Sequence, residues 1–200
     1  MGEKMRKALA MLLCVFMMFE LVACGSSGKA KTPDITYSYS EAKDGTITLT
    51  LSDDYEKLRN QEGCDKAKKM YGYKDVKYNE DTKSVTYTLT PEQHTAMLRM
   101  NAYNMLMIFS AMPGSDTYKN ITNIQPNSEL SEFVITTKSQ TLTKEEKNLF
   151  NFFYKYGSIY GLYRGVRPVD VVVRFENSGS GKVIEERHSE SDSGWPGLDH

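Results

Sequence analysis

The sequence has few of the residues that most often carry chemistry in a protein site. It contains three cysteines and three histidines in 200 residues. It contains no HExxH, GxSxG or P-loop motif and no paired Cys-x-x-Cys. Nothing in the sequence orients Cys64 toward His94 as a thiol and its base. We therefore predict that the protein is not an enzyme and that it has no cofactor and no metal site.

The chain also lacks an excess of charge of either sign. It has 25 basic and 26 acidic residues, which gives a net charge of −1. A nucleic-acid-binding protein usually carries a basic patch or stripe, and no such footprint is visible here. The same balance gives no polybasic footprint for binding to a membrane surface. We therefore expect no nucleic-acid partner.

The N-terminus, by contrast, has a clear organisation. A short charged head at residues 3–7 precedes Ala8–Phe19, which is a run of 12 uncharged residues. These are the first two regions of an export signal. The run is too short for a permanent transmembrane helix, which needs about 20 apolar residues. A plain secretory signal is the other alternative, but the residues around Ala23 fit its cleavage site poorly.

The end of this run resembles a bacterial lipobox. Leu21, Val22 and Ala23 precede Cys24, and Gly25 and two serines follow it. The resemblance implies that Leu21, Ala23 and Gly25 take part in signal recognition and that Cys24 receives a diacylglyceryl anchor. It also implies that residues 1–23 are removed as a lipoprotein signal peptide. The expected location is the cell membrane, with the protein lipid-anchored on its extracytoplasmic face.

After these assignments one cysteine, Cys64, remains. A single thiol cannot form an intramolecular disulfide, so the chain is not a disulfide scaffold. Cys64 is either a small buried residue or a reactive thiol, and the sequence leaves both readings open.

The remaining chain divides into three parts. Residues 24–34 are small and polar, and we expect a flexible tether. Residues 35–187 form the predicted domain. Residues 188–200 are rich in Ser, Asp, Glu and Gly, and we expect a disordered tail.

Within 35–187, alternating strands joined by turns recur, and each pair is followed by a helix signal. The predicted strand pairs are 35–40 with 46–52, 76–78 with 84–90, 121–124 with 132–137, and 169–175 with 182–187. Ser52 with two following acids predicts a short helix to about Gln61, with a restart after Gly63. Thr90 and Thr143 begin capping boxes, which predict helices from Pro91 and Lys144.

This order predicts an α+β fold. We expect a mainly antiparallel sheet built from strand-turn-strand-helix units, with helices packed on one face and a C-terminal hairpin. Glu132–Thr137, the aromatic helix that ends in Gly157–Val166 and the Val-rich strand after it resemble small uncharacterised surface lipoproteins of Gram-positive bacteria. The resemblance implies the fold and the location, and it brings no activity with it.

Two helices carry the candidate binding residues. The helix from Pro91 holds Met97, Met100, Met105, Met107 and Met112. Thioethers bind Cu(I), but core packing or an adaptable contact surface is the more common use of methionine. Leu98, Ala102, Met105, Phe109 and Met112 have the spacing of a core stripe. The segment Met105–Phe109 is apolar all round, so it is either covered on two sides or contacts a partner.

The helix from Lys144 is rich in aromatic residues. Leu149, Phe153, Tyr156, Tyr160 and Tyr163 can form one stripe against the sheet. Phe150 and Tyr154 then point elsewhere, which makes them candidates for partner contacts, although core packing is the ordinary alternative.

The functional hypothesis is a non-enzymatic binding module of the cell envelope. Phe150, Tyr154 and Met107 are its candidate contact residues, and the expected partner is a cell-envelope protein, peptide or glycan. The alternative is a carrier or sensor that holds a small apolar ligand between the Met-rich helix and the sheet.

Overall fold

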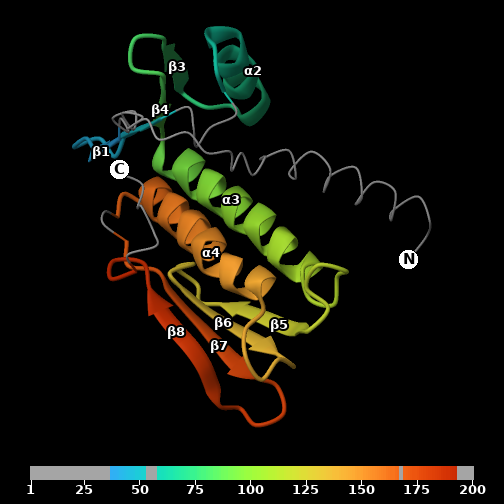
Figure 1. Ribbon diagram of the computed structural model, residues 1–200. Coiled ribbons are helices and arrows are strands. Elements are labelled where there is room, and N and C mark those ends of the chain that lie inside the picture. Colours follow the sequence, from blue (N-terminus) through green and yellow to red (C-terminus); the bar gives the residue numbers. More distant parts are fainter. Residues whose placement is uncertain (1–36, 53–57, 167–168, 193–200) are drawn as a thin grey trace, which may run out of the picture. The chain divides into compact units, whose positions relative to one another are not determined.

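The structure is a computed structural model that describes residues 37–52, 58–166 and 169–192. All of these belong to one compact unit, which begins at Pro33. The lipobox residues Leu21, Ala23, Cys24 and Gly25 lie outside the described residues. The unit is α+β, as predicted. Its helices are α2 (Gln61–Tyr71), α3 (Pro91–Ala111) and α4 (Lys144–Tyr163) (Figure 1).

The strands form two sheets of four strands, where the sequence had suggested one. Sheet A has the order β1-β2-β4-β3 and sheet B has the order β5-β6-β7-β8. The strands of sheet A are β1 (Ser38–Glu41), β2 (Ile47–Ser52), β3 (Asp75–Asn79) and β4 (Ser84–Leu89). Those of sheet B are β5 (Ile121–Pro126), β6 (Glu132–Thr137), β7 (Val172–Asn177) and β8 (Val183–His188). Each sheet is thus assembled from two of the predicted hairpins.

Both sheets are mostly antiparallel, and the one exception lies in the middle of sheet B. Strands β6 and β7 run parallel, with Phe133 opposite Val173 and Ile135 opposite Phe175. Parallel neighbours need a crossover connection, and α4 supplies it. In sheet A, β2 and β4 pair antiparallel, with Leu49 opposite Tyr87. The two hairpins are therefore joined by an antiparallel pair of strands in sheet A and by a parallel pair in sheet B.

The predicted capping boxes are confirmed. Thr90 accepts a hydrogen bond from the Gln93 amide, and Thr143 accepts one from the Glu146 amide. The predicted short helix after Ser52 falls largely on residues 53–57, which lie outside the described residues. Residues 58–60 are not helical, so that helix does not reach Gln61, and the predicted restart corresponds to α2, whose N-cap is Asn60. The Asn60 side chain accepts from the Gly63 amide at 2.8 Å, which explains why the helix begins there.

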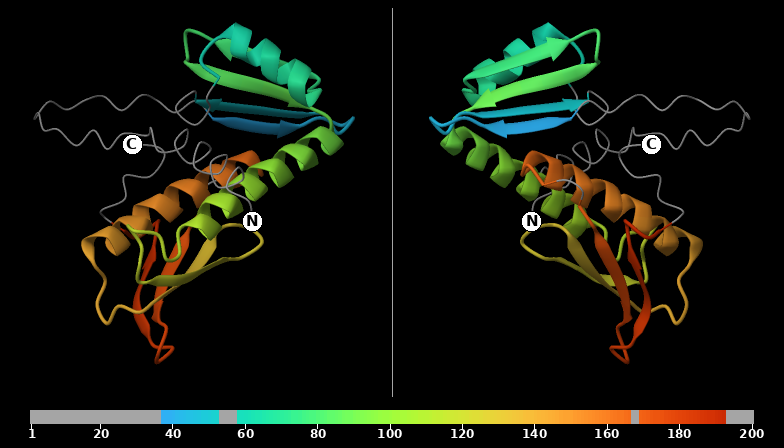
Figure 2. Two further views of the ribbon diagram at one scale, coloured as in Figure 1. Left: turned by 90° about the vertical axis from the view of Figure 1, so that its right-hand side faces the viewer. Right: turned by 90° about the vertical axis from the view of Figure 1, so that its left-hand side faces the viewer.

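Helices α3 and α4 contact each other, α4 contacts β7, and α3 contacts β4 and β5. In Figures 1 and 2 the two helices lie side by side between the sheets. Buried side chains of both sheets and of α3 and α4 belong to one hydrophobic core. The repeated units therefore share a single core.

Helix α4 packs closely against the residues that precede β6 and β7. Gly157, Gly161 and every residue between them are buried. A Cβ atom at Gly157 would lie 2.6 Å from the Leu130 carbonyl oxygen and 2.8 Å from a Val171 methyl group. These distances are too short for any side chain, so glycine is what permits the approach.

The C-terminal end of α4 is tied to the first half of the chain. His94 Nε2 lies 2.7 Å from the Tyr163 carbonyl oxygen, and both residues are buried. The Tyr37 hydroxyl donates to the Leu162 carbonyl at 3.2 Å. The last carbonyls of a helix lack partners in a following helical turn. The Leu162 carbonyl also accepts from the Gly165 amide at 3.0 Å, so Tyr37 adds a second bond there, and His94 contacts the Tyr163 carbonyl.

The predicted tail begins too early. His188 is the last residue of β8, and Ser189 is buried. The Val171 amide donates to the Ser189 hydroxyl at 2.8 Å, and the Ser189 amide donates to the Val171 carbonyl at 3.0 Å. These bonds continue the pairing beyond the strand. Residues 188–192 are thus part of the fold, and residues 193–200 lie outside the described residues.

The close approach of α4 predicts the effect of one methyl group. Alanine normally stabilises a helix by about 1 kcal/mol relative to glycine. At residue 157 we expect the opposite: Gly157→Ala lowers the free energy of unfolding by about 1–3 kcal/mol because backbone must shift. Urea denaturation measures this change.

The matched control is Gly179→Ala, where the nearest atom would lie at 3.5 Å. We expect a change within about 0.5 kcal/mol there. A Gly157→Ala protein as stable as the parent would show that α4 does not pack this closely.

Candidate functional site

The outer face of α3 exposes large apolar side chains. Tyr103 is 63% exposed, Leu106 is 43% exposed and Met107 is 37% exposed. Their spacing places them on one side of the helix, since residues three and four apart are neighbours on a helix. The opposite side of α3 carries Met105 and Phe109, which are buried in the core. We call Tyr103, Leu106 and Met107 the α3 surface.

Very little charge accompanies the α3 surface. Within Pro91–Ala111, Glu92 and Arg99 are the only acidic, lysine or arginine residues. An exposed helix face normally carries charged residues opposite its apolar stripe. Exposed apolar surface that carries little charge is typical of a site where another molecule binds.

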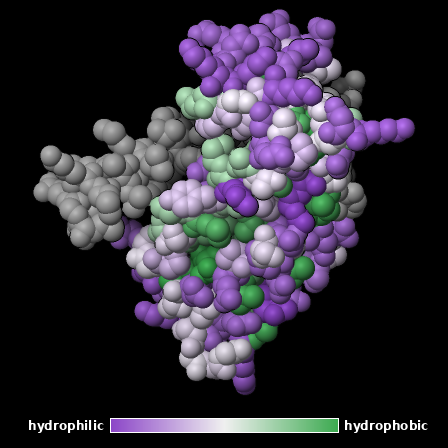
Figure 3. All heavy atoms as spheres, turned by 180° about the vertical axis from the view of Figure 1, so that it is seen from behind, coloured by the Kyte–Doolittle hydropathy of each residue, from purple (hydrophilic) through white to green (hydrophobic). Residues whose placement is uncertain are grey.

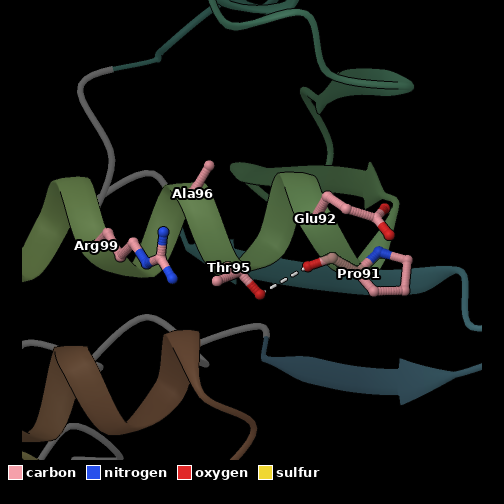
Figure 4. Close-up of a pocket in the computed structure, with 5 residues that line it drawn as sticks. All are labelled: Pro91, Glu92, Thr95, Ala96 and Arg99. Carbon is pink, nitrogen blue, oxygen red and sulfur yellow. Dashed lines mark hydrogen bonds between the residues drawn. The ribbon is translucent and has the colours of Figure 1, made fainter.

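A shallow hollow of 550 Å³ opens at the N-terminal end of the same helix. Its described lining residues are Pro91, Glu92, Thr95, Ala96 and Arg99, all from α3 (Figure 4). The Thr95 hydroxyl donates to the Pro91 carbonyl at 2.9 Å, so it is already engaged within the helix. An open hollow of this kind suits a broad contact surface better than a small enclosed ligand.

Two of the three candidate contact residues were placed wrongly. Phe150 is 1% exposed and Tyr154 is fully buried, so neither presents a surface to a partner. The Phe150 ring lies 5.2 Å from the Phe175 ring, and the Arg187 guanidinium lies 4.4 Å from its centroid. Arg187, at the end of the predicted domain, contacts Phe150, and Asp192, in the predicted tail, contacts Tyr154.

Tyr154 shows how complete this cover is. Its hydroxyl donates to an Asp192 carboxylate oxygen at 3.3 Å. Burial, reinforced by the negative charge of Asp192, raises the pKa of Tyr154 far above its usual range. The side chain therefore stays neutral and belongs to the packing of the C-terminal segment.

Met107 is exposed as proposed, and the structure adds Tyr103 and Leu106 to it. A signal for these two was present in the sequence. The all-round apolar segment Met105–Phe109 had to be covered twice or left partly exposed, and only one side of it faces the core. Tyr103 lies outside the all-round apolar segment, so its exposure becomes evident only from the packing of α3 against the core.

Three of the other methionines predicted for this helix, and Cys64, are buried. Met97, Met105 and Met112 lie in the core, whereas Met100 is half-buried. Of the predicted core stripe, Leu98 and Ala102 are only partly buried. Cys64 is fully buried, which agrees with its reading as a small core residue. Within residues 37–52, 58–166 and 169–192, no group of three or more His, Cys, Asp and Glu residues could hold a metal ion.

A polar cluster lies at the C-terminal end of β8. His188 Nδ1 lies 2.7 Å from Asp170, and its Nε2 lies 3.7 Å from Glu186. The hydrogen bond to Asp170, helped by the negative charges of both carboxylates, raises the pKa of His188 above its ordinary value of 6.5.

A hollow of 280 Å³ opens beside this cluster, with Glu186, Arg187, His188, Ser191 and Asp192 in its lining. Arg187 is already paired with Glu185 and Asp192. The cluster thus fastens the C-terminal segment to Asp170.

Comparison with known proteins gives no relative from which a function can be transferred. No protein-family model, no curated protein and no solved structure matches the chain. None of the described helices is long and apolar enough to cross a membrane. The candidate site is therefore defined by its own geometry.

The His188 pair predicts a pH dependence of stability. A histidine whose pKa is raised on folding adds stability in full below its unfolded pKa of about 6.5, and this addition is lost as the pH rises through the folded pKa. We therefore expect the unfolding midpoint of the parent to fall as the pH rises from about 6 to 8.

In His188→Gln this fall should flatten, because the titrating group is gone while an amide remains near Asp170. This fall is measured from the urea midpoints of the parent, His188→Gln and a second histidine variant, His94→Gln, at several pH values. Equal slopes in the parent and His188→Gln would contradict the assignment.

Proposed function

We propose that the protein is a lipid-anchored extracytoplasmic binding module whose α3 surface contacts a protein or peptide of the cell envelope. The observation that carries the binding role is the α3 surface, with side chains exposed by 37% to 63% on a helix of almost no charge. The support for the location is the sequence Leu21–Gly25 after its uncharged run.

The chemistry of the α3 surface favours a protein or peptide over a glycan. Leu106 and Met107 offer no hydrogen-bonding groups to sugar hydroxyls. Methionine adapts its shape to an apolar partner, and tyrosine is enriched at the centre of protein interfaces. A partner that presents its own apolar side chains would remove this surface from water.

The carrier alternative gains no support from the hollows. A carrier of the expected kind needs an enclosed apolar cavity between α3 and a sheet. The hollows at Pro91–Arg99 and at Glu186–Asp192 are both open to solvent. The buried methionines of α3 instead fill the core.

The anchor is tested by labelling growing cells with an alkyne fatty acid. We expect the parent protein to carry the label and to fractionate with membranes, and Cys24→Ala to lose the label. Cys64→Ser serves as the control, because Cys64 is buried and should not affect labelling. Equal labelling of the parent and Cys24→Ala would refute the anchor.

The α3 surface is tested with Tyr103→Lys and Met107→Lys in the anchored protein. Truncation or charge at the centre of an interface typically weakens binding tenfold or more, which corresponds to about 1.4 kcal/mol. We expect each variant to recover at least about tenfold less of the envelope protein that the parent captures after crosslinking in cells.

The matched control is Ser178→Lys in the exposed β7–β8 turn, which should capture as much as the parent. Urea denaturation should show all three variants to be as stable as the parent. Equal recovery with every variant would exclude the α3 surface as the binding site.

A further inference from the structure

A second exposed apolar feature lies at the C-terminal end of α2. Met70 is 73% exposed and Tyr71 is 47% exposed. The Tyr71 ring lies 5.4 Å from the Tyr73 ring, which is buried and meets Tyr87 edge-on at 5.8 Å. Tyr71 is thus supported by the core of sheet A, whereas Met70 extends into solvent.

Lysines surround this end of the helix. Lys66 lies one turn before Met70 on the same face, and Lys69 precedes Met70. Lys74 follows the turn, and its ammonium group donates to the Thr46 hydroxyl at 3.0 Å. The segment 61–79 has five lysines and three acidic residues. Lys66 is paired with Glu62 at 2.6 Å, but Lys69 has no acidic partner within 4.0 Å among the described residues. We call Lys66, Lys69, Met70, Tyr71 and Lys74 the α2 tip.

The end of α2 that carries the tip is held in a fixed position. Gly72 adopts the left-handed conformation, with φ 68°, and ends the helix. Gln93, in the first turn of α3, donates to the Gly72 carbonyl at 2.6 Å and accepts from the Lys74 amide at 3.1 Å. The direction of the tip is therefore coupled to α3. Figure 3 shows a largely hydrophilic surface at the top, the height at which Figure 1 places α2 and β3.

We propose that the α2 tip docks on a lipid surface that contains anionic head groups. Lysines near such a surface are attracted to it, and apolar side chains between them can enter the head-group region. Tyrosine is favoured at this depth because one end of its ring is apolar and the other is polar. The tip carries both parts of this chemistry: lysine charge and a protruding methionine.

The inference rests on the proposed function, because the anchor at Cys24 would hold the domain beside a membrane. Docking then adds orientation to the anchor. Since Gln93 couples the tip to α3, a docked tip would fix the direction in which the α3 surface faces. An anionic polymer would be drawn to the lysines but offers no apolar layer, so entry of the side chain at residue 70 into an apolar environment distinguishes the two.

The test places a polarity-sensitive dye at the tip. The full chain with Met70→Cys is labelled and added to vesicles that are either wholly zwitterionic or contain anionic lipid. We expect the dye emission to shift to that of an apolar environment on anionic vesicles alone. The same dye at Ser178→Cys, in the β7–β8 turn, should remain in water in both cases.

Removal of the charges gives the second arm. We expect Lys66→Gln, Lys69→Gln and Lys74→Gln together to weaken docking about 100-fold, at about fivefold for each lysine. An emission shift that persists in this triple variant, or a dye that stays in water on anionic vesicles, would overturn the proposal. Binding to anionic vesicles that needs the lysines while the dye stays in water would also overturn it, because the lysines would then act without entry of residue 70 into the head-group region.

The same measurement with Cys24→Ala separates the two proposals. If the anchor is absent but the α2 tip is correctly identified, the emission shift on anionic vesicles persists with and without Cys24. If the tip is wrong, the shift is missing even where fatty-acid labelling of Cys24 succeeds.

Discussion

The structure depends on how the buried C-terminal end of α4 satisfies its carbonyl groups. A helix leaves its last carbonyls without partners, and burial without hydrogen bonds costs about 1–3 kcal/mol for each such group. His94 bonds to the Tyr163 carbonyl, and Tyr37 adds a bond to the Leu162 carbonyl, which also accepts from the Gly165 amide. Since His94 belongs to α3 and Tyr37 precedes β1, the same bonds join the first half of the chain to the second.

This constraint also explains which side of α3 is left for a partner. His94, Met97, Met105 and Phe109 all lie on the side that faces the core. With that side committed, Tyr103, Leu106 and Met107 remain 37% to 63% exposed. The exposed face is thus a consequence of how α3 is held, and its apolar composition is what calls for a function.

Local features of the fold were readable from the sequence, whereas features that depend on distant segments were not. Thr90 and Thr143 identified two helix starts because a capping box involves residues three apart. The parallel pairing of β6 with β7 gives no local signal. Phe150 and Tyr154 remained candidate contact residues, with core packing as the alternative, because the residues that cover them, Arg187 and Asp192, lie more than 35 residues further along the chain. Met107 was identified because apolar residues all round a helix cannot all face one core.

Site-specific photocrosslinking in living cells tests most directly whether the α3 surface binds a partner. A photoreactive amino acid replaces Met107, with the same replacement at Ser178 as the reference. We expect one crosslinked product of defined mass from residue 107 and none from residue 178. The product should be reduced when Tyr103 is changed to lysine. No product from Met107, or the same products from both positions, would contradict the claim that the α3 surface binds a partner.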